Sequence, residues 1–237
     1  MIYTTKTCRR GHVVKRTVGT AIAATAVLLF NVGSTGGANA TTDEFDRTEL
    51  GANWITAGGG ILHIAEGRLS ADGTPSEPVS MAFHAVPAAG ETQEVQATIR
   101  WNGRNPEHSA MSIALRADPA TQHAGVHFWF TATSMGLSLL SWDGTTFTPA
   151  AGTDKYIPVW FKWPDGTTVR LRAEGDTYAA YLGDSPRPIL SGTFTEEQVP
   201  HTNRYGGVHG QDDSEAPGGG EPPAVLDDFR FSTPAID

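Results

Sequence analysis

The 237-residue sequence contains one cysteine, Cys8, which lies close to the amino terminus. The rest of the chain therefore excludes disulfides, zinc–thiolate sites and cysteine nucleophiles. Convincing helical patterning is also missing, because no stretch of helix length repeats its apolar residues every three or four positions. The G-x-S-x-G motif of α/β-hydrolases does not occur, and the eight histidines follow no spacing typical of metal ligands.

The first 40 residues differ in composition from all that follows. They carry five basic residues and no Asp or Glu, then an apolar run from about Val18 to Val32, and they end in Ala38-Asn39-Ala40. This order is typical of a secretory signal with an A-x-A cleavage site. A transmembrane anchor fits less well, because the run is shorter than the about 20 residues that span a bilayer. We therefore expect a signal peptide, residues 1–40, cleaved after Ala40, and a secreted mature domain, residues 41–237.

Removal of this segment would make the chain strongly acidic. The formal net charge of the whole sequence is -9, and the 12 Lys and Arg that follow residue 40, against 26 Asp and Glu, give -14. Such a surface repels nucleic acid and anionic membranes. We expect neither a nucleic acid partner nor membrane insertion after cleavage. The sequence leaves the oligomeric state open.

Short runs in which apolar and polar residues alternate dominate the mature domain. The segment from Val159 to Asp184 predicts three antiparallel strands, with turns at Pro164-Asp165-Gly166 and Glu174-Gly175-Asp176. The same alternation predicts a second meander of three strands, at residues 95–101, 111–116 and 126–131.

Turn signals recur along the whole mature domain at intervals of about ten residues. Short strands without helices between them predict an all-β fold, a two-sheet antiparallel β-sandwich or closed jelly roll. The segment from Gln211 to Pro223 is acidic and rich in Gly and Pro, which indicates a surface loop. The last predicted strand, Val225 to Phe231, is too short to stand alone, so it must return to the main sheet.

Three segments resemble the concanavalin A-like lectin/glucanase superfamily, the jelly rolls that include laminin-G-like domains. They are the opening Phe45-Asp46-Arg47 with Leu50 to Trp54, the hairpin Thr168 to Thr177, and the closing Tyr205 to Val208 with Asp227 to Phe231. The likeness spans almost all of residues 43–232. It implies a jelly roll whose last strand pairs beside the first. It also implies a domain that often binds, and sometimes cleaves, carbohydrate.

Catalysis is the less favoured of the implied activities. The E-x-D-x-x-E strand of many glucanases in this superfamily puts two catalytic carboxylates on one face. Neither Glu91 with Glu94 nor Glu196-Glu197 matches that spacing. The polysaccharide-lyase branch uses Arg, His and Tyr on the concave sheet, and an enzyme of that kind would use Arg100, His127 and Tyr181.

Trp129 is the best candidate for binding a ligand. Alternation places Val126, Phe128 and Phe130 in the core, so Trp129 and His127 share the opposite face of their strand. A large aromatic side chain there indicates sugar stacking or cover by a loop, and both remain open. Arg100 and Arg116 are expected on nearby strands, where they would bind sugar hydroxyls or a carboxylated glycan, or form surface ion pairs.

A structural calcium ion is a further expectation from the resemblance. Jelly rolls often bind calcium near their joined ends through carboxylates and backbone carbonyls. Asp46, Asp227 and Asp228 would converge there if the end strands pair. The alternative is an ordinary acidic strand end.

The sequence therefore favours a secreted, non-catalytic carbohydrate-binding or cell-surface interaction module, with a polysaccharide or other glycan as its partner. Two alternatives remain: a polysaccharide-degrading jelly roll (a lyase or glycoside hydrolase), and a structural or adhesive surface protein without a sugar ligand.

Overall fold

The computed structural model describes residues 40–58, 61–72, 79–100, 110–131, 133–142, 147–159, 163–211 and 225–234. All of them belong to one compact unit, Thr35–Asp237. The predicted signal peptide before Ala40 and the predicted loop 211–223, apart from Gln211, lie outside the described residues. No described helix is both long and apolar enough to cross a membrane.

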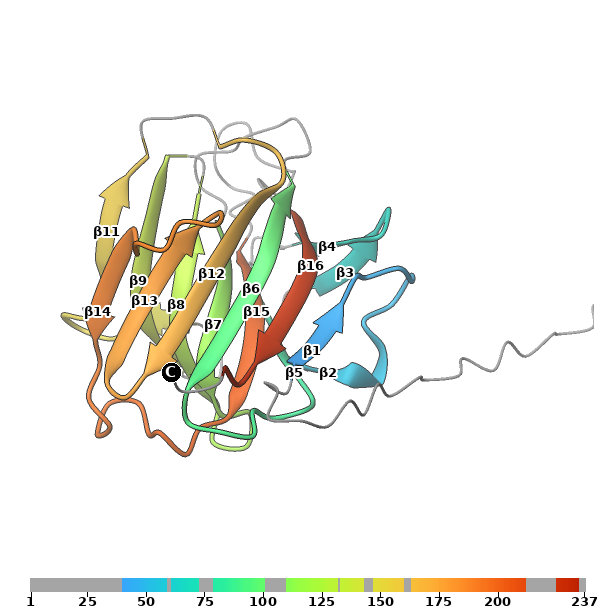
Figure 1. Cartoon of the computed structure of the whole chain (residues 1–237). Helices are drawn as coiled ribbons and strands as arrows, with labels where there is room; N and C mark the ends of the chain where they lie inside the picture. The colour runs from blue at the N-terminus through green and yellow to red at the C-terminus, as the bar shows by residue number, and fades with distance from the viewer. Residues whose placement is uncertain are drawn as a thin grey trace, which may run out of the picture. The chain divides into compact units, whose positions relative to one another are not determined.

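Two antiparallel eight-stranded sheets face each other (Figure 1). Sheet A has the spatial order β14 (Leu190–Thr193), β13 (Thr177–Leu182), β12 (Thr167–Glu174), β6 (Gln93–Arg100), β16 (Val225–Ser232), β4 (Arg68–Asp72) and β3 (Ile61–Ala65), with β1 (Ala40–Asp43) paired to β16. Sheet B has the order β10 (Phe147–Pro149), β9 (Ser134–Trp142), β8 (His123–Phe130), β7 (Ala110–Ala117), β15 (Tyr205–Gln211), β5 (Val79–His84) and β2 (Trp54–Ala57), with β11 (Lys155–Pro158) paired to β9. The predicted all-β, two-sheet antiparallel sandwich is confirmed.

The core lies between the sheets and takes every second residue of their strands. Val169, Leu171 and Ala173 of β12 are fully buried, while Arg170 and Arg172 between them are half-buried on the outer face. Val126, Phe128 and Phe130 of β8 are fully buried from the opposite side, as the alternation predicts. Complete burial of one such side chain contributes about 1.5–3 kcal/mol. The period of two in the sequence is therefore the pattern that drives the two sheets together.

Two predicted meanders need correction. The hairpin β12–β13 forms with Glu174 opposite Thr177, but Val159 and Trp163 are buried residues outside any strand, and residues 160–162 are not described. The strands β6 and β7 follow each other in sequence yet belong to different sheets, so only β7 and β8 of the second meander are neighbours. Alternation marks where a strand runs but carries no information about which sheet receives it.

The two ends of the domain meet at one buried carboxylate. Asp43 of β1 lies opposite Phe229 of β16, which confirms the pairing of the first and last strands. Its two oxygens each accept a hydrogen bond of 2.6 Å from the Arg47 guanidinium. The indole Nε1 of Trp54 donates to Asp43 at 2.7 Å, and the Phe45 N–H donates at 2.9 Å. These contacts connect Phe45, Arg47 and Trp54 of the opening motif to Asp43, which lies just before it.

The Asp43 cluster has a defined pH dependence. Burial alone would raise the pKa of Asp43, but hydrogen bonds from Arg47, Trp54 and Phe45 outweigh it, and the net shift lowers the pKa below 3.8. A carboxyl group whose pKa is lowered by folding stabilises the fold above its unfolded pKa. That contribution is lost as the pH falls through the folded pKa.

We predict that Asp43→Asn lowers the free energy of unfolding at pH 7 by about 2 kcal/mol, because the Arg47 and Trp54 donors lose their charged acceptor. Urea unfolding of the two proteins at a series of pH values from 7 downward measures the difference, which should shrink as the pH falls through the folded pKa of Asp43. Asp46→Asn is the matched control, because Asp46 is exposed. Equal losses in the two variants would contradict the assignment.

Candidate functional site

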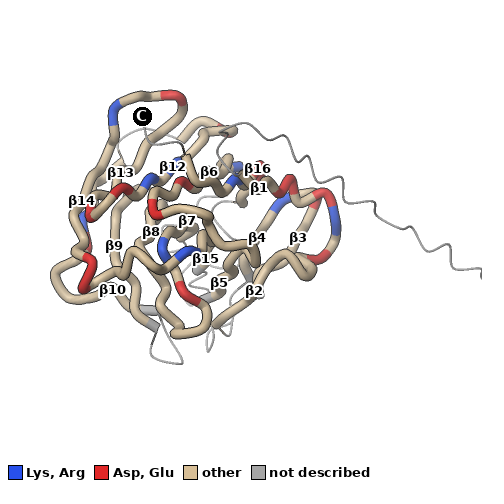
Figure 2. The backbone as a smooth tube through the Cα atoms, turned by 60° about the horizontal axis from the view of Figure 1, so that its bottom comes forward, with Lys and Arg blue, Asp and Glu red and all other residues tan. Residues whose placement is uncertain are grey.

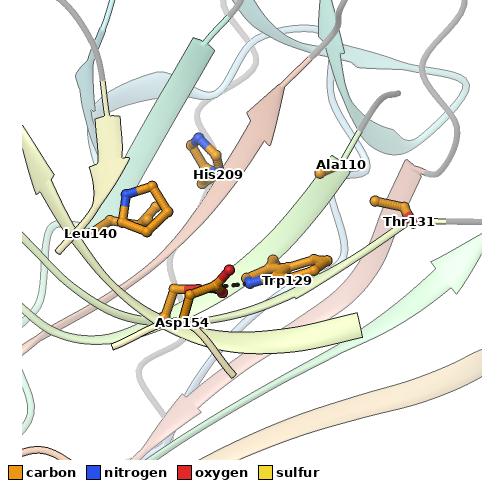
Figure 3. Close-up of a pocket in the computed structure, with 8 residues that line it drawn as sticks. Ala110, Trp129, Thr131, Leu140, Asp154 and His209 are labelled. Carbon is orange, nitrogen blue, oxygen red and sulfur yellow. Dashed lines mark hydrogen bonds between the residues drawn. The ribbon is translucent and has the colours of Figure 1, made fainter. Parts of the chain in front are cut away.

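A pocket of about 240 Å³ lies on the outer face of sheet B, away from the core (Figure 3). Its described lining residues come from β7, β8, β9, β10 and β15, from the position just after β8 and from the segment before β11: Ala110, Trp129, Thr131, Ser138, Leu140, Pro149, Asp154 and His209. The lining residue Leu140 also belongs to a second buried apolar cluster, with Met81, Phe83, Ala114, Ala117 and Ala124. The outer face of sheet B therefore carries a pocket with polar lining groups next to a cluster of apolar side chains.

Trp129 is held in the pocket by a chain of two hydrogen bonds. Its Nε1–H donates to Ser138 Oγ at 2.8 Å, and the Ser138 hydroxyl donates to Asp154 Oδ1 at 2.5 Å. Figure 3 shows the indole and the Asp154 carboxylate side by side. The serine can serve both partners because a hydroxyl is donor and acceptor at once. The indole is thus fixed in one orientation before any ligand arrives.

Gly136 is the residue on β9 directly opposite Trp129. A Cβ atom at Gly136 would lie 2.4 Å from Trp129 Cζ2 and 2.5 Å from Cε2, so a side chain here would force the indole to move. The absence of a side chain here lets the indole lie directly against the β9 backbone between Gly136 and Ser138.

Two buried histidines lie on the same sheet face as the indole, and one of them, His209, lines the pocket. His127 Nε2 donates to the Ala124 carbonyl at 3.0 Å, so its Nδ1 accepts from the Ser112 hydroxyl at 2.9 Å. Ser112 Oγ in turn accepts from His209 Nδ1 at 3.3 Å. Burial lowers the pKa of His127 well below 6.5 and that of His209 to about 4. Both rings are neutral at pH 7, and Asp154 carries the charge among the described lining residues.

Solved structures of carbohydrate-binding proteins share this arrangement of sheets. The Ca2+/Man2-bound exoplasmic/lumenal domain of VIP36 aligns with a TM-score of 0.55 at 10% identity, covering 86% of this chain and 92% of that one. The carbohydrate recognition domain of Emp46p aligns at 0.53 and 11% identity (82% and 95% covered), and lectin II from Ulex europaeus at 0.50 and 10% (82% and 97%). The chain has the concanavalin A-like lectin fold. No family model and no curated protein matches the sequence.

Within this lectin fold, Arg116 does not face outward as expected. It is fully buried, and its guanidinium donates to Tyr178 Oη and to the Glu91 carbonyl, each at 3.3 Å. The cause is a break in the alternation of β7: Arg116 has a φ of 54°, and the pairing of β7 with β15 shifts register beside it. Burial raises the pKa of Tyr178 to about 12, an effect that the Arg116 charge partly opposes. Arg116 is part of the core and cannot reach the pocket.

The other predicted residues divide between the two sheets. His127 shares a face with Trp129, as predicted, but it is fully buried and supports the site through Ser112. Arg100 lies on sheet A, where it forms ion pairs with Asp227 at 3.4 Å and Asp165 at 3.6 Å. Basic and acidic positions alike occur along β12, β6 and β16 of that sheet (Figure 2). Arg100 is therefore not on a strand near Trp129, and that expectation is wrong.

The residues of the enzyme alternative are not brought together. Tyr181 lies on sheet A with the Arg170 guanidinium 4.4 Å from its ring centroid, while His127 belongs to sheet B. A lyase site would need Arg100, His127 and Tyr181 within hydrogen-bonding reach of one substrate.

The predicted calcium ligands form no cluster either. Among the described residues, no three His, Cys, Asp or Glu side chains are placed to hold a metal ion. Asp227 instead accepts hydrogen bonds from Arg100 and from the Asp228 N–H. The carboxylate at the joined ends is Asp43 rather than Asp46, and Arg47 already neutralises it.

Sequence reasoning missed Asp154, Ser138, Gly136 and His209. Only His209 has a visible signal, because it follows the core residue Val208 in a strand and therefore faces outward. The others depend on cross-strand register, which a sequence does not reveal.

We predict that the free energy of unfolding falls as the pH is lowered from 6.5 to 4. Over this range histidines in the unfolded chain bind protons, whereas the buried histidines of the folded protein remain neutral. Each such histidine contributes a slope of about 1.4 kcal/mol per pH unit. His209→Asn should reduce the slope by about one such increment, which urea unfolding at pH 7, 5.5 and 4.5 can measure. An unchanged slope would show that His209 titrates alike in both states.

Proposed function

We propose that the protein is a secreted, non-catalytic module that binds a neutral glycan in the Trp129 pocket. The observation that carries the proposal is an oriented indole in a pocket whose rim holds a carboxylate and hydroxyls. A pyranose has an apolar face that packs on an aromatic ring, and a rim of hydroxyls that need hydrogen-bond partners. Trp129 provides the first, and Asp154 and Thr131 provide the second.

The size and charge of the pocket support a neutral sugar unit as the ligand. Its volume of about 240 Å³ is below the 300–1,000 Å³ typical of drug-sized ligands. Asp154 repels a carboxylated or sulfated sugar, while both histidines nearby are neutral at pH 7. Arg100 and Arg116, which a carboxylated glycan would need, lie elsewhere.

A non-catalytic role is favoured because the described lining residues include one carboxylate, Asp154. Glycosidases generally need two carboxyl groups on opposite sides of the bond that breaks. The lectin-fold proteins that align with this chain bear names of carbohydrate-recognition proteins, and their low identity makes this support for the proposal and nothing more.

We predict that Trp129→Ala lowers affinity for the retained polysaccharide at least tenfold, because the stacking surface is lost. Affinity electrophoresis of the purified protein in gels cast with laminarin, xylan, glucomannan or polygalacturonate measures this as lost retardation. Gly136→Ala should act in the same direction by displacing the ring. Tyr181→Ala is the control, an outward aromatic on sheet A that should leave retardation unchanged.

A folded wild-type protein that no gel retards would rule out glycan binding and favour the adhesive alternative. Cleared polymer behind the band would instead favour the enzyme.

Secretion forms a separate part of the proposal and rests on the basic, then apolar, then small-residue order of positions 1–40. Expression of the full chain in a bacterial host that exports it should give a product beginning at Thr41. Amino-terminal sequencing of the exported protein checks this, and recovery of the intact chain from the membrane fraction would favour an anchor.

A further inference from the structure

Tyr156 on β11 is an exposed aromatic residue beside the pocket. Its side chain is 66% exposed, which is more than that of the other exposed large apolar residues described, Ile55, Val86 and Ile189. The next residue, Ile157, packs against the core. Successive strand residues face opposite ways, so Tyr156 points away from the core, on the outer face of sheet B.

The register places Tyr156 and Trp129 in one row across three strands. Tyr156 lies opposite Gly136 from one side, and Trp129 lies opposite Gly136 from the other. Directly opposite residues of an antiparallel pair share a face. The two aromatic positions are therefore two strands apart, about 10 Å from backbone to backbone. The residue between them is Gly136, so this cross-strand position carries no side chain of its own.

Asp154 lies close to these two aromatic positions. It precedes Tyr156 by two residues and reaches Ser138 on β9, which puts its carboxylate on the same face. Lys155 does not offset this charge at the site, because its Nζ lies beside Gly192 on β14 of the other sheet. Trp129 and Tyr156 thus offer two rings on which sugars can stack, and the Asp154 carboxylate beside them can accept hydrogen bonds from sugar hydroxyls. None of these three side chains is basic.

The site is open on the Tyr156 side. Among the described strands, β11 pairs with β9 alone, so it forms an edge of sheet B. The Trp129 indole itself lies over Gly136, so a ligand that stacks on the indole and continues in this direction passes Tyr156 and then reaches solvent. A closed pocket would accept a chain end, whereas this layout accommodates a chain that continues past both rings.

We propose that Tyr156 forms a second sugar subsite, so that the protein binds an extended, neutral polysaccharide chain running across β8, β9 and β11. This inference rests on the glycan-binding function proposed above. Trp129 holds one sugar ring, and Tyr156 stacks on a ring further along the same chain. Affinity then rises with chain length up to the number of units that covers both rings, and stays level beyond it.

The test uses isothermal titration calorimetry of the purified wild-type protein with xylo-, manno- and gluco-oligosaccharides of one to six units. Tyr156→Ala should leave affinity for the shortest binding oligosaccharide unchanged and should lower affinity for the six-unit chain at least fivefold. Tyr156→Phe should retain most of the long-chain affinity, because it keeps the ring. Tyr181→Ala on sheet A is the matched control and should behave as wild type.

The outcomes separate this inference from the proposed function. Equal affinity of Tyr156→Ala and wild type at every length, with Trp129→Ala impaired, would overturn the second subsite and leave the Trp129 site standing. Wild-type affinity that does not rise with chain length would also overturn it. A wild type that binds none of the three series would overturn both. Stronger retardation by polygalacturonate than by neutral polymers would overturn the neutral-chain assignment.

Discussion

Two sheets can close on each other only if every second residue of their strands is apolar, and this constraint decides which side chains remain for function. On β8 the core takes Val126, Phe128 and Phe130, which leaves His127 and Trp129 on the outer face. Because the core side is packed, any ligand chemistry on this strand must come from those two outward positions. The location of the pocket is thus a consequence of how the core is built.

The buried polar side chains on the outer face of sheet B are stabilised by hydrogen bonds to one another. His127, Ser112 and His209 satisfy one another in a chain that ends on the Ala124 carbonyl, so their burial does not leave these hydrogen-bonding atoms stranded. The same principle orients Trp129 through Ser138 and Asp154. A ring that is already immobile loses little conformational entropy when a ligand stacks on it, so the free energy of binding is more favourable than for a mobile ring.

Local patterns could be predicted from the sequence, but long-range pairings could not. The alternation located the strands and turned Trp129 outward, and the end motifs indicated that β1 and β16 meet. The alternation could not show that β6 and β7 enter different sheets, because strands of both sheets have the same period of two. Arg116 was misplaced because a positive φ locally reverses the alternation. Asp154 and Gly136 join the site only through the register of β9 with β8 and β11, which no single strand encodes.

An exposed aromatic on a sheet edge is usually a hazard, since an unpaired strand invites pairing with another chain. The edge strand β11 has features that oppose this: it is four residues long, it carries Lys155, and it ends at Pro158, which has no N–H to donate. Such an edge resists another strand but leaves the Tyr156 ring accessible from its face. A sugar chain needs that face and not the backbone hydrogen bonds. The edge therefore suits a ligand that stacks on side chains better than a partner that adds a strand.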